Sequence, residues 1–195
     1  MIAVVDSGGA NLTSVLDALE RLGAQATLTR DPETIRRGEK VILPGVGAAG
    51  PAMERLRSAG LDGCLKELTQ PVLGICLGMQ LLFTSSEEGP TDCLGIIPGR
   101  VTRLRPQGLA VPHMGWNQVA LQRPSALFEG ISENEFFYFV HSYQAEPGAW
   151  VTARCDYGAP VPAAVERGNF FGVQFHPERS SKAGARLLQN FLALR

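Results

Sequence analysis

The chain has 195 residues, of which 45% are hydrophobic and 19% charged, and its 18 basic and 19 acidic side chains leave a formal net charge of −1. That length suits one domain with a sizeable core, because chains mostly divide beyond roughly 250 residues. A protein that binds nucleic acid or an anionic membrane surface is expected to carry a basic excess, so the near-neutral balance argues against both classes. We therefore expect a single domain over residues 1–195.

Cysteine and histidine are too sparse for a metal centre or a disulfide framework. Four cysteines without a CxxC pair and three histidines without an HExxH motif predict no metal and no cofactor. The N-terminal residues lack the basic region and long apolar segment of a signal peptide, and no apolar run approaches the ~18 residues of a membrane span. We therefore expect a cytoplasmic protein with free thiols.

The first half of the chain alternates strand-like and helix-like segments. We expect strands over 2–5, 26–29, 41–43 and 72–75, and helices over 12–22, after Pro32, near 51–69 and from Leu77. Because these strands are continuously apolar, they indicate a parallel sheet covered by helices on both faces.

The second half is rich in strands separated by turns. Strands are expected over 101–105, 117–121, 136–140, 150–155, 161–165 and 170–175, and a final helix from about 181 to 194. These strands read as antiparallel additions to the same sheet. The predicted fold is a single-domain mixed α/β structure with a mainly parallel sheet flanked by helices.

The segment Gly74-Ile75-Cys76-Leu77-Gly78 follows a predicted buried strand and opens a predicted helix, as a G-x-S/C-x-G nucleophile elbow requires. At a helix N-terminus the thiolate of Cys76 would be favoured by unpaired N–H groups and the helix dipole. The amide of Leu77 is placed to donate to an oxyanion. The alternative is a buried structural cysteine, which is the common state of free cysteine.

A strand-like segment leads into His176-Pro177-Glu178 near the end of the chain. In an extended chain residues two apart point to the same side, so His176 and Glu178 can project into one site. They would supply a base for the thiol and a carboxylate that orients the base. The alternatives are a hydrogen-bonded histidine at a strand end and a solvated glutamate.

Pro44-Gly45-Val46-Gly47 follows another buried strand. In an open α/β sheet the sites form at the carboxyl ends of the strands, so this loop is expected beside Cys76. Its glycines allow a backbone N–H to turn inward as a second oxyanion donor, although an ordinary strand-to-helix turn would have the same composition.

These residues resemble a known family. PGVG, GICLGMQLLF (74–83) and GVQFHPE (172–178), in that order, resemble the triad-type, or class I, glutamine amidotransferases over essentially the whole chain. DSGGANLTSV (6–15), LLFTSSEEG (81–89), PHMGWN (112–117) and FVHSY (139–143) narrow the resemblance to the glutaminase subunits of imidazole glycerol phosphate synthases.

The resemblance implies hydrolysis of L-glutamine to glutamate and ammonia. Cys76 would attack the side-chain amide and form a glutamyl thioester, His176 would carry the proton to ammonia, and Glu178 would orient His176. Val46 or Gly47, with Leu77, would supply the oxyanion amides. Residues at positions that hold glutamine in the family are Gln80, Glu88, Ser142 and Tyr143.

The resemblance also implies a partner. The ammonia would pass through a tunnel to a separate (β/α)8-barrel cyclase, in a heterodimer that makes imidazole glycerol phosphate and an aminoimidazole carboxamide ribonucleotide in histidine biosynthesis. The expected partner interface consists of His113, Met114, Trp116 and Asn117; a turn around Gly115 with a buried Trp116 is the alternative. We further expect a glutaminase that is nearly silent until its nucleotide-bound partner docks.

One stretch departs from the family pattern, since a usual Tyr-Gly-Met-Gly-Asn-like sequence reads Ser7-Gly8-Gly9-Ala10-Asn11 here. We expect the fold and triad to be unaffected. Three other functions stay open at this level: the glutaminase of another class I system such as pyridoxal phosphate synthase, a catalytically inactive amidotransferase-like binding module, and a cysteine peptidase of similar fold, which would need a peptide-binding groove.

Overall fold

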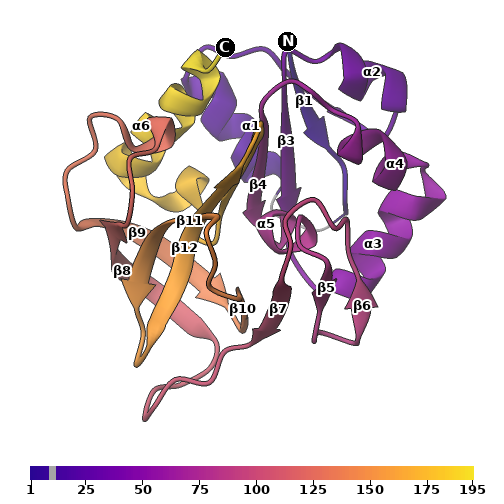
Figure 1. The fold of residues 1–195 in the computed structure, drawn as a ribbon. Helices are drawn as coiled ribbons and strands as arrows, with labels where there is room; N and C mark the ends of the chain where they lie inside the picture. Colours follow the sequence, from indigo (N-terminus) through magenta and orange to yellow (C-terminus); the bar gives the residue numbers. More distant parts are fainter. Residues whose placement is uncertain (9–11) are drawn as a thin grey trace.

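The computed structural model describes residues 1–8 and 12–195, and its first half alternates strands and helices as predicted (Figure 1). The elements are β1 (Ile2–Val5), α1 (Leu12–Arg21), β2 (Ala26–Thr29), α2 (Pro32–Arg37), β3 (Lys40–Gly45), α3 (Ala49–Ser58), α4 (Leu61–Lys66), β4 (Val72–Cys76) and α5 (Leu77–Leu81). Each predicted strand of this half is confirmed, and β3 and β4 run further toward the loops that follow them.

The second half is mainly β. Its elements are β5 (Ser85–Ser86), β6 (Thr91–Asp92), β7 (Arg100–Arg103), β8 (His113–Leu121), the 3-10 turn η1 (Ala126–Phe128), β9 (Glu135–His141), β10 (Tyr143–Ala145), β11 (Val151–Asp156), β12 (Pro160–Arg167), β13 (Phe170–Val173), the 3-10 turn η2 (Pro177–Arg179) and α6 (Ser181–Ala193). The strand predicted over 117–121 begins four residues earlier, at His113, because Gly115 is accommodated inside the strand at φ 136°.

The main sheet has nine strands in the order β2-β1-β3-β4-β13-β12-β11-β8-β9. Pairing is parallel from β2 to β13 and antiparallel from β13 to β9. The predicted mixed α/β sheet is therefore confirmed. β13, from the end of the chain, lies directly beside β4, which brings the segment after Val173 close to the end of β4 at Cys76.

A second sheet, in the order β10-β7-β5-β6, corrects part of the prediction. The strand expected near 101–105 was assigned to the main sheet, whereas β7 pairs with β10 and β5 in this smaller one. Val101 and Ala145 are buried in the core on the α3 side, so these short strands cover that core. In Figure 1 the small sheet lies below the carboxyl ends of β3 and β4.

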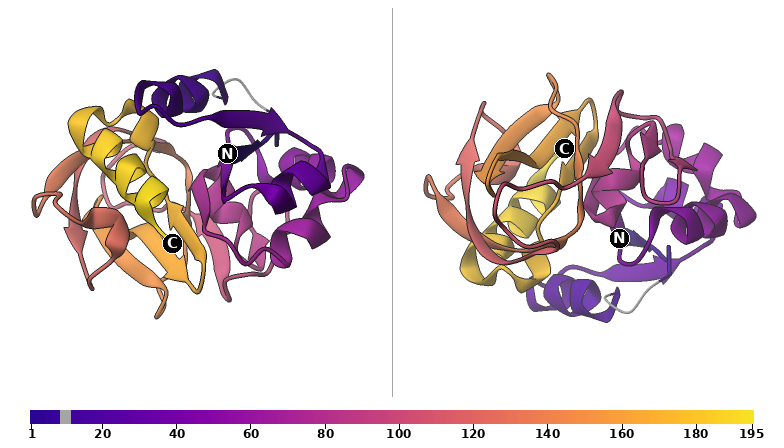
Figure 2. Two further views of the ribbon diagram at one scale, coloured as in Figure 1. Left: turned by 90° about the horizontal axis from the view of Figure 1, so that it is seen from above. Right: turned by 90° about the horizontal axis from the view of Figure 1, so that it is seen from below.

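Two hydrophobic cores lie on opposite faces of the main sheet. Val4, Ile42 and Ile75 pack toward α1 and α6, while their neighbours Val5 and Val41 pack toward α2, α3 and α4. Figure 2 shows these two groups of helices on either side of the strands. The continuous apolar runs of β1, β3 and β4 follow from burial on both faces.

The helix predicted near 51–69 is two helices. Gly60 adopts φ 66° and ψ 21°, a left-handed conformation that favours glycine, and it separates α3 from α4. Both helices still bury an apolar side against the sheet, so the correction concerns the path of the chain and leaves the layer unchanged.

Candidate active site

Cys76 occupies the sharp turn between β4 and α5. Its backbone has φ 52° and ψ −110°, a region that residues other than glycine rarely adopt and that costs on the order of 1–3 kcal/mol. The flanking glycines permit the turn: a Cβ on Gly78 would overlap the carbonyl of Leu43, and a Cβ on Gly74 would lie 2.7 Å from the Gly78 oxygen. The strand–turn–helix context predicted for a nucleophile elbow is therefore present.

His176 and Glu178 form a buried pair. Nδ1 of His176 lies 2.7 Å from Oε1 of Glu178, and their side chains are 3% and 0% exposed. Glu178 belongs to the 3-10 turn η2, so the extended geometry expected after His176 is replaced by a tight turn that still brings the two groups together. Because Glu178 is fully buried, the alternative of a solvated loop charge is wrong.

His176 also interacts with Cys76. Burial alone would lower the pKa of His176, but its interactions with Cys76 and Glu178 outweigh this effect and raise the pKa to about 10. A thiol, an imidazole and a carboxylate thus stand in the order that covalent catalysis requires.

A pocket of about 490 Å³ opens over Cys76. Its walls include Val46, Gly47, Cys76, Leu77, Gln80, Glu88, Ser142, Tyr143 and His176. The predicted oxyanion and substrate-binding residues are thus gathered around the nucleophile from four separate stretches of the chain.

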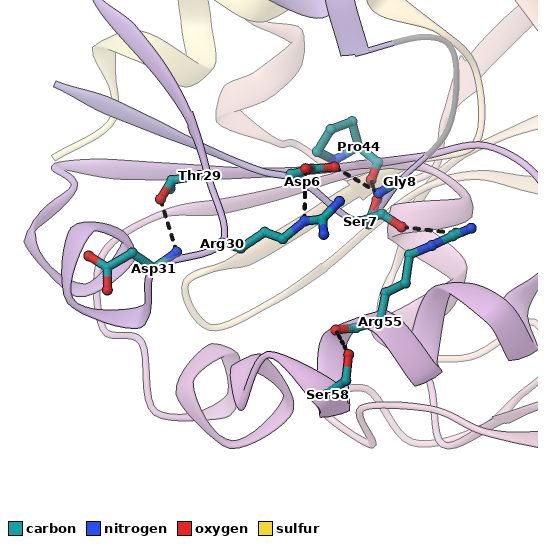
Figure 3. A network of polar contacts seen from close by, with 9 residues as sticks. All are labelled: Asp6, Ser7, Gly8, Thr29, Arg30, Asp31, Pro44, Arg55 and Ser58. Atoms are coloured by element: carbon teal, nitrogen blue, oxygen red, sulfur yellow. Dashed lines mark hydrogen bonds and ion pairs between the residues drawn. The ribbon is translucent and has the colours of Figure 1, made fainter.

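The Pro44–Gly47 loop is anchored from the end of β1 (Figure 3). The buried hydroxyl of Ser7 donates to the carbonyl of Pro44 at 2.6 Å. The following turn is held by Asp6, whose carboxylate accepts from the amide of Gly8 at 3.0 Å and from Nε of Arg30 at 2.8 Å. Gly47 then adopts φ 92°, a value that favours glycine, at the wall of the pocket.

Glu88 and Gln80 have defined partners. Oε2 of Glu88 accepts from the amide of Ala49 at 2.9 Å, which ties the pocket wall to the start of α3 just beyond the Pro44–Gly47 loop. Nε2 of Gln80 donates to the Tyr143 carbonyl at 2.9 Å and to Oε1 of Gln174 at 3.0 Å. Both N–H groups of Gln80 are occupied, so its Oε1 is the atom available to a ligand.

A family model for class-I glutamine amidotransferases matches residues 3–194. The chain belongs to the class-I glutamine amidotransferase family. It is 54% identical over 194 residues to a protein of Xanthomonas campestris pv. campestris (strain 8004) and 48% identical over 199 residues to one of Vibrio parahaemolyticus, both named imidazole glycerol phosphate synthase subunit HisH. The alignments cover 99% of this chain and 97% and 98% of the two relatives.

Solved amidotransferase structures share the fold. One, titled as the crystal structure of a glutamine amidotransferase, superposes with a TM-score of 0.77 at 22% identity and covers 98% of this chain and 96% of its own. The glutaminase domain of Trypanosoma brucei CTPS with bound acivicin gives 0.69 at 16% identity, with 100% and 94% covered. At these identities the likeness concerns the fold alone.

Two residues of this site, Gln174 and His141, have no role predicted from the sequence. Gln174 is fully buried, and its Nε2 lies 3.7 Å from Sγ of Cys76. His141 lines the pocket near His176. Side chains two residues apart in a strand point to the same side, so the sequence could have placed Gln174 on the side of His176. No local sequence pattern indicates a role for His141.

The PHMGWN stretch lies on β8 near the edge of the main sheet. Met114 and Trp116 are 63% and 52% exposed, so the alternative of a buried Trp116 is wrong. His113 requires a correction, because its ring is 2% exposed and lies beneath this surface. Nδ2 of Asn117 lies 3.3 Å from Nε2 of His113 and donates to the carbonyl of Asp156 at 2.8 Å.

The remaining thiols differ from Cys76 in their surroundings. Burial raises the pKa of Cys93 to about 11 and that of Cys155 to about 12, and it raises the pKa of Cys64 as well. In the described ranges, residues 1–8 and 12–195, no cluster of three potential metal ligands occurs. Across the same ranges no helix has the length and apolar character needed to cross a bilayer.

Of the stretch 7–11 that departs from the family pattern, the structure describes only residues 7 and 8. Ser7 anchors Pro44 and Gly8 adopts φ 82°, while residues 9–11 lie outside the part of the chain that the structure describes. The fold and the pairing of His176 with Glu178 are present despite this departure.

Proposed function

We propose that the chain is the glutaminase subunit of an imidazole glycerol phosphate synthase, which hydrolyses L-glutamine and supplies ammonia for histidine biosynthesis. The observation that carries the proposal is the buried arrangement of Cys76, His176 and Glu178, in which Cys76 and His176 line the pocket and Glu178 lies behind His176. Full-length relatives named as HisH subunits of that synthase support the choice within the family.

The chemistry begins at the sulfur of Cys76. The thiol proton of Cys76 passes to His176 as the sulfur attacks the side-chain amide carbon of glutamine, and the amide nitrogen leaves as ammonia after taking that proton from His176. A glutamyl thioester remains on Cys76. Water then loses a proton to His176 and attacks the thioester carbon, the C–S bond breaks to release glutamate, and His176 returns the proton to the sulfur to restore the thiol. Glu178 keeps Nδ1 of His176 hydrogen-bonded throughout.

The tetrahedral intermediate carries a negative oxygen that needs donors. The amide of Leu77, at the start of α5, is one donor, and the second comes from Val46 or Gly47 in the facing loop. Each such donor contributes roughly 100- to 1000-fold in rate in other acyl-transfer enzymes. The glycine at position 47, with φ 92°, allows the loop to turn its amides.

Polar groups around the pocket would hold the amino-acid end of glutamine. Glu88 offers a carboxylate to the α-ammonium group, and Ser142 and Tyr143 offer donors to the α-carboxylate. Oε1 of Gln80, left available by its two occupied N–H groups, accepts from the substrate. These roles agree with a pocket of moderate size that contains both acceptors and donors.

A cyclase subunit with a (β/α)8 barrel is the partner that this function requires. The exposed apolar side chains of Met114, Trp116 and Phe136 lie on neighbouring strands β8 and β9 and provide an apolar centre for docking. Docking beside the pocket would place the ammonia exit against the barrel and turn the Pro44–Gly47 loop into its active state, so the isolated chain is nearly silent.

Alkylation and turnover test the chemistry. Cys76→Ala should abolish glutamine hydrolysis measured with the cyclase and its nucleotide ligand present, while binding to the cyclase is retained. Cys93→Ala is the matched control and should keep turnover, because the Cys93 thiol is buried outside the pocket. Turnover by Cys76→Ala, or labelling of Cys93 in place of Cys76 by a thiol-alkylating glutamine analogue, would refute the assignment.

The docking face is tested by affinity. Trp116→Ala should weaken binding of the cyclase by about 30-fold. This factor corresponds to a loss of about 2 kcal/mol of binding free energy, as expected for a large side chain at the centre of an interface. Leu28→Ala, an exposed apolar residue on β2 at the opposite edge of the sheet, should leave binding unchanged. Equal effects of the two substitutions, or full glutaminase activity of the isolated chain, would exclude this part of the proposal.

A further inference from the structure

Two buried histidines that the proposed chemistry does not use lie side by side between the exposed β8–β9 surface and the pocket. His113 on β8 and His141 on β9 are cross-strand partners, and Nδ1 of His113 lies 3.0 Å from Nε2 of His141. The ring of His113 is stacked between Phe139, at 4.7 Å, and Tyr157, at 3.9 Å between ring centres. Packing on both faces fixes the plane of this imidazole.

The end of the pair nearer the pocket determines the tautomer of His141. Its Nδ1 lies 2.8 Å from the backbone carbonyl of Tyr143. A carbonyl oxygen only accepts, so Nδ1 of His141 must carry the hydrogen. In the neutral ring Nε2 is then an acceptor, and Nδ1 of His113 must donate to it.

The other end determines the tautomer of His113 independently. Oδ1 of Asn117 accepts from the amide of Gln118 at 2.8 Å, and its Nδ2 donates to the carbonyl of Asp156 at 2.8 Å, which fixes the orientation of the amide group. The second hydrogen on Nδ2 is directed at Nε2 of His113, 3.3 Å away. Nε2 of His113 is therefore an acceptor, and the hydrogen lies on Nδ1.

The two ends require the same tautomer in both rings, and no site remains for a further proton. An added proton on either ring would place two N–H groups face to face. Burial also lowers the pKa of both histidines to about 4, and for His141 the nearby His176 and His113 act in the same direction. The pair His113 and His141 is thus neutral.

The hydrogen-bond chain continues from His141 to the nucleophile. The Tyr143 carbonyl that accepts from His141 also accepts from Nε2 of Gln80. Gln80 in turn donates to Gln174, and Gln174 donates to Sγ of Cys76. Each donor in this chain of hydrogen bonds has an acceptor, so displacement of one residue disturbs the next.

We propose that His113 and His141 are positioning residues for glutamine hydrolysis. As a neutral pair with fixed tautomers they hold the Tyr143 carbonyl, and through it Gln80 and Gln174, in place at Cys76, and they tie this arrangement to Asn117 on β8. The proposal rests on the proposed glutaminase function and deepens it: the strand that carries the docking side chains Met114 and Trp116 is linked by hydrogen bonds to the substrate pocket.

Steady-state kinetics of the complex with the cyclase test the positioning role. His113→Phe keeps an aromatic ring for stacking but removes both hydrogen bonds, and we expect kcat/KM for glutamine to fall about 10- to 100-fold, mainly through a higher KM because Gln80 is displaced. His113→Asn retains a donor near the position of Nδ1 and should recover part of this loss. Tyr157→Phe, which keeps the stack and removes only a bond to the Ala110 carbonyl, is the control and should resemble the unaltered protein.

A measurement of KM distinguishes a positioning role of His113 from a merely structural one. A variant that only folds less well reduces the amount of active enzyme, so kcat falls while KM stays constant. Such a pattern, or equal losses in His113→Phe and His113→Asn, would overturn the proposal. Melting temperatures of the three variants identify any that do not fold, and Gln174→Leu then tests the same chain from its other end with the same expected rise in KM.

Nitrogen NMR of the 15N-histidine-labelled protein tests the tautomers without any activity. We expect Nδ1–H and a bare Nε2 in both His113 and His141 at pH 7, with neither ring taking up a second proton down to about pH 5. An Nε2–H on either ring would refute the assignment. If the unaltered complex failed to hydrolyse glutamine, the proposed function would fall while the tautomer result stood on its own.

Discussion

Glu178 is a buried carboxylate that acts on the state of His176, the base of the proposed mechanism. It lies 2.7 Å from His176 in a place without solvent exposure, and it contributes to the raised pKa of that imidazole. The neutral amide of a Glu178→Gln variant would keep the size of the side chain but remove the charge.

We expect Glu178→Gln to lower kcat by about 100-fold or more, as loss of the orienting carboxylate does in other triads. The pKa of His176 should fall, so the rate profile against pH should shift to lower pH. Glu87→Gln, at an exposed carboxylate that also accepts a backbone amide, is the control and should change neither quantity. An unchanged pH profile in Glu178→Gln would contradict the role given to Glu178.

Ser7 provides a second prediction for a single residue. Ser7→Ala leaves the buried Pro44 carbonyl without its donor, at a cost of about 1–3 kcal/mol in stability, and frees the loop that carries Val46 and Gly47. We expect kcat to fall several-fold with little change in KM, because the loop acts on the oxyanion. Ser58→Ala, which loses only an exposed bond to Arg55 (Figure 3), should behave as the unaltered protein in both kinetics and melting temperature.

The site was predictable from sequence where its chemistry is local. The glycines of Gly74–Gly78 bracket the turn at Cys76 within five residues, so the local pattern sufficed there. Glu178 lies beside His176 through a 3-10 turn and not through the extended geometry expected. Ser7 acts on a residue 37 positions away and Gln174 on one 98 positions away. The period of two could place Gln174 on the side of His176, but the contacts with Pro44 and Cys76 depend on strand order, which the period of a segment does not encode.

At the scale of elements, α5 sits unusually close to β3. Gly78→Ala should displace α5, because its Cβ would overlap the carbonyl of Leu43, whose strand is buried on both sides and has no room to move. We expect a lower melting temperature and the loss of glutaminase activity. Gly63→Ala, in α4 with open space around it, should be stabilised by up to about 1 kcal/mol and stay fully active. Equal melting temperatures for the two variants would show that the close approach is not needed.

Elements were predicted well where they are long and continuously apolar, as in β1, β3 and β4. The two- and three-residue strands β5, β6 and β10 were not foreseen, because so few residues display no period. Because β7 pairs with β10 and β5, the strand near 101–105 belongs to the small sheet and not to the main one. The break at Gly60 was missed because the apolar spacing continues on both sides of it.

At the scale of the whole molecule, the free energy of unfolding depends on pH through histidines whose pKa values are shifted in opposite directions. His113 and His141 have a pKa lowered to about 4, so the unfolded chain binds more protons than the folded one between about pH 6.5 and 4. The free energy of unfolding must fall as the pH is lowered through that window. His176, with its raised pKa, contributes stability that is present below about pH 6.5 and is lost as the pH rises toward 10.

Urea unfolding at several pH values checks these signs. His113→Phe should lose less stability than the unaltered protein between pH 6.5 and 4, because one of the two neutral histidines is gone. His176→Gln should remove part of the loss between pH 7 and 10. A variant His113→Phe with the same acid dependence as the unaltered protein would contradict the lowered pKa of the pair.

The position of β13 has a consequence for synthesis on the ribosome. Residues 170–173 insert between β4 and β12, although β4 ends at residue 76. A nascent chain of about 150 residues already contains the nucleophile, yet one edge of β4 has no neighbour to pair with, and an unpaired buried strand readily joins another chain. We therefore expect chains that stop before residue 170 to depend on chaperones, and the thiol of Cys76 to meet His176 only after residues 170–178 have been synthesised.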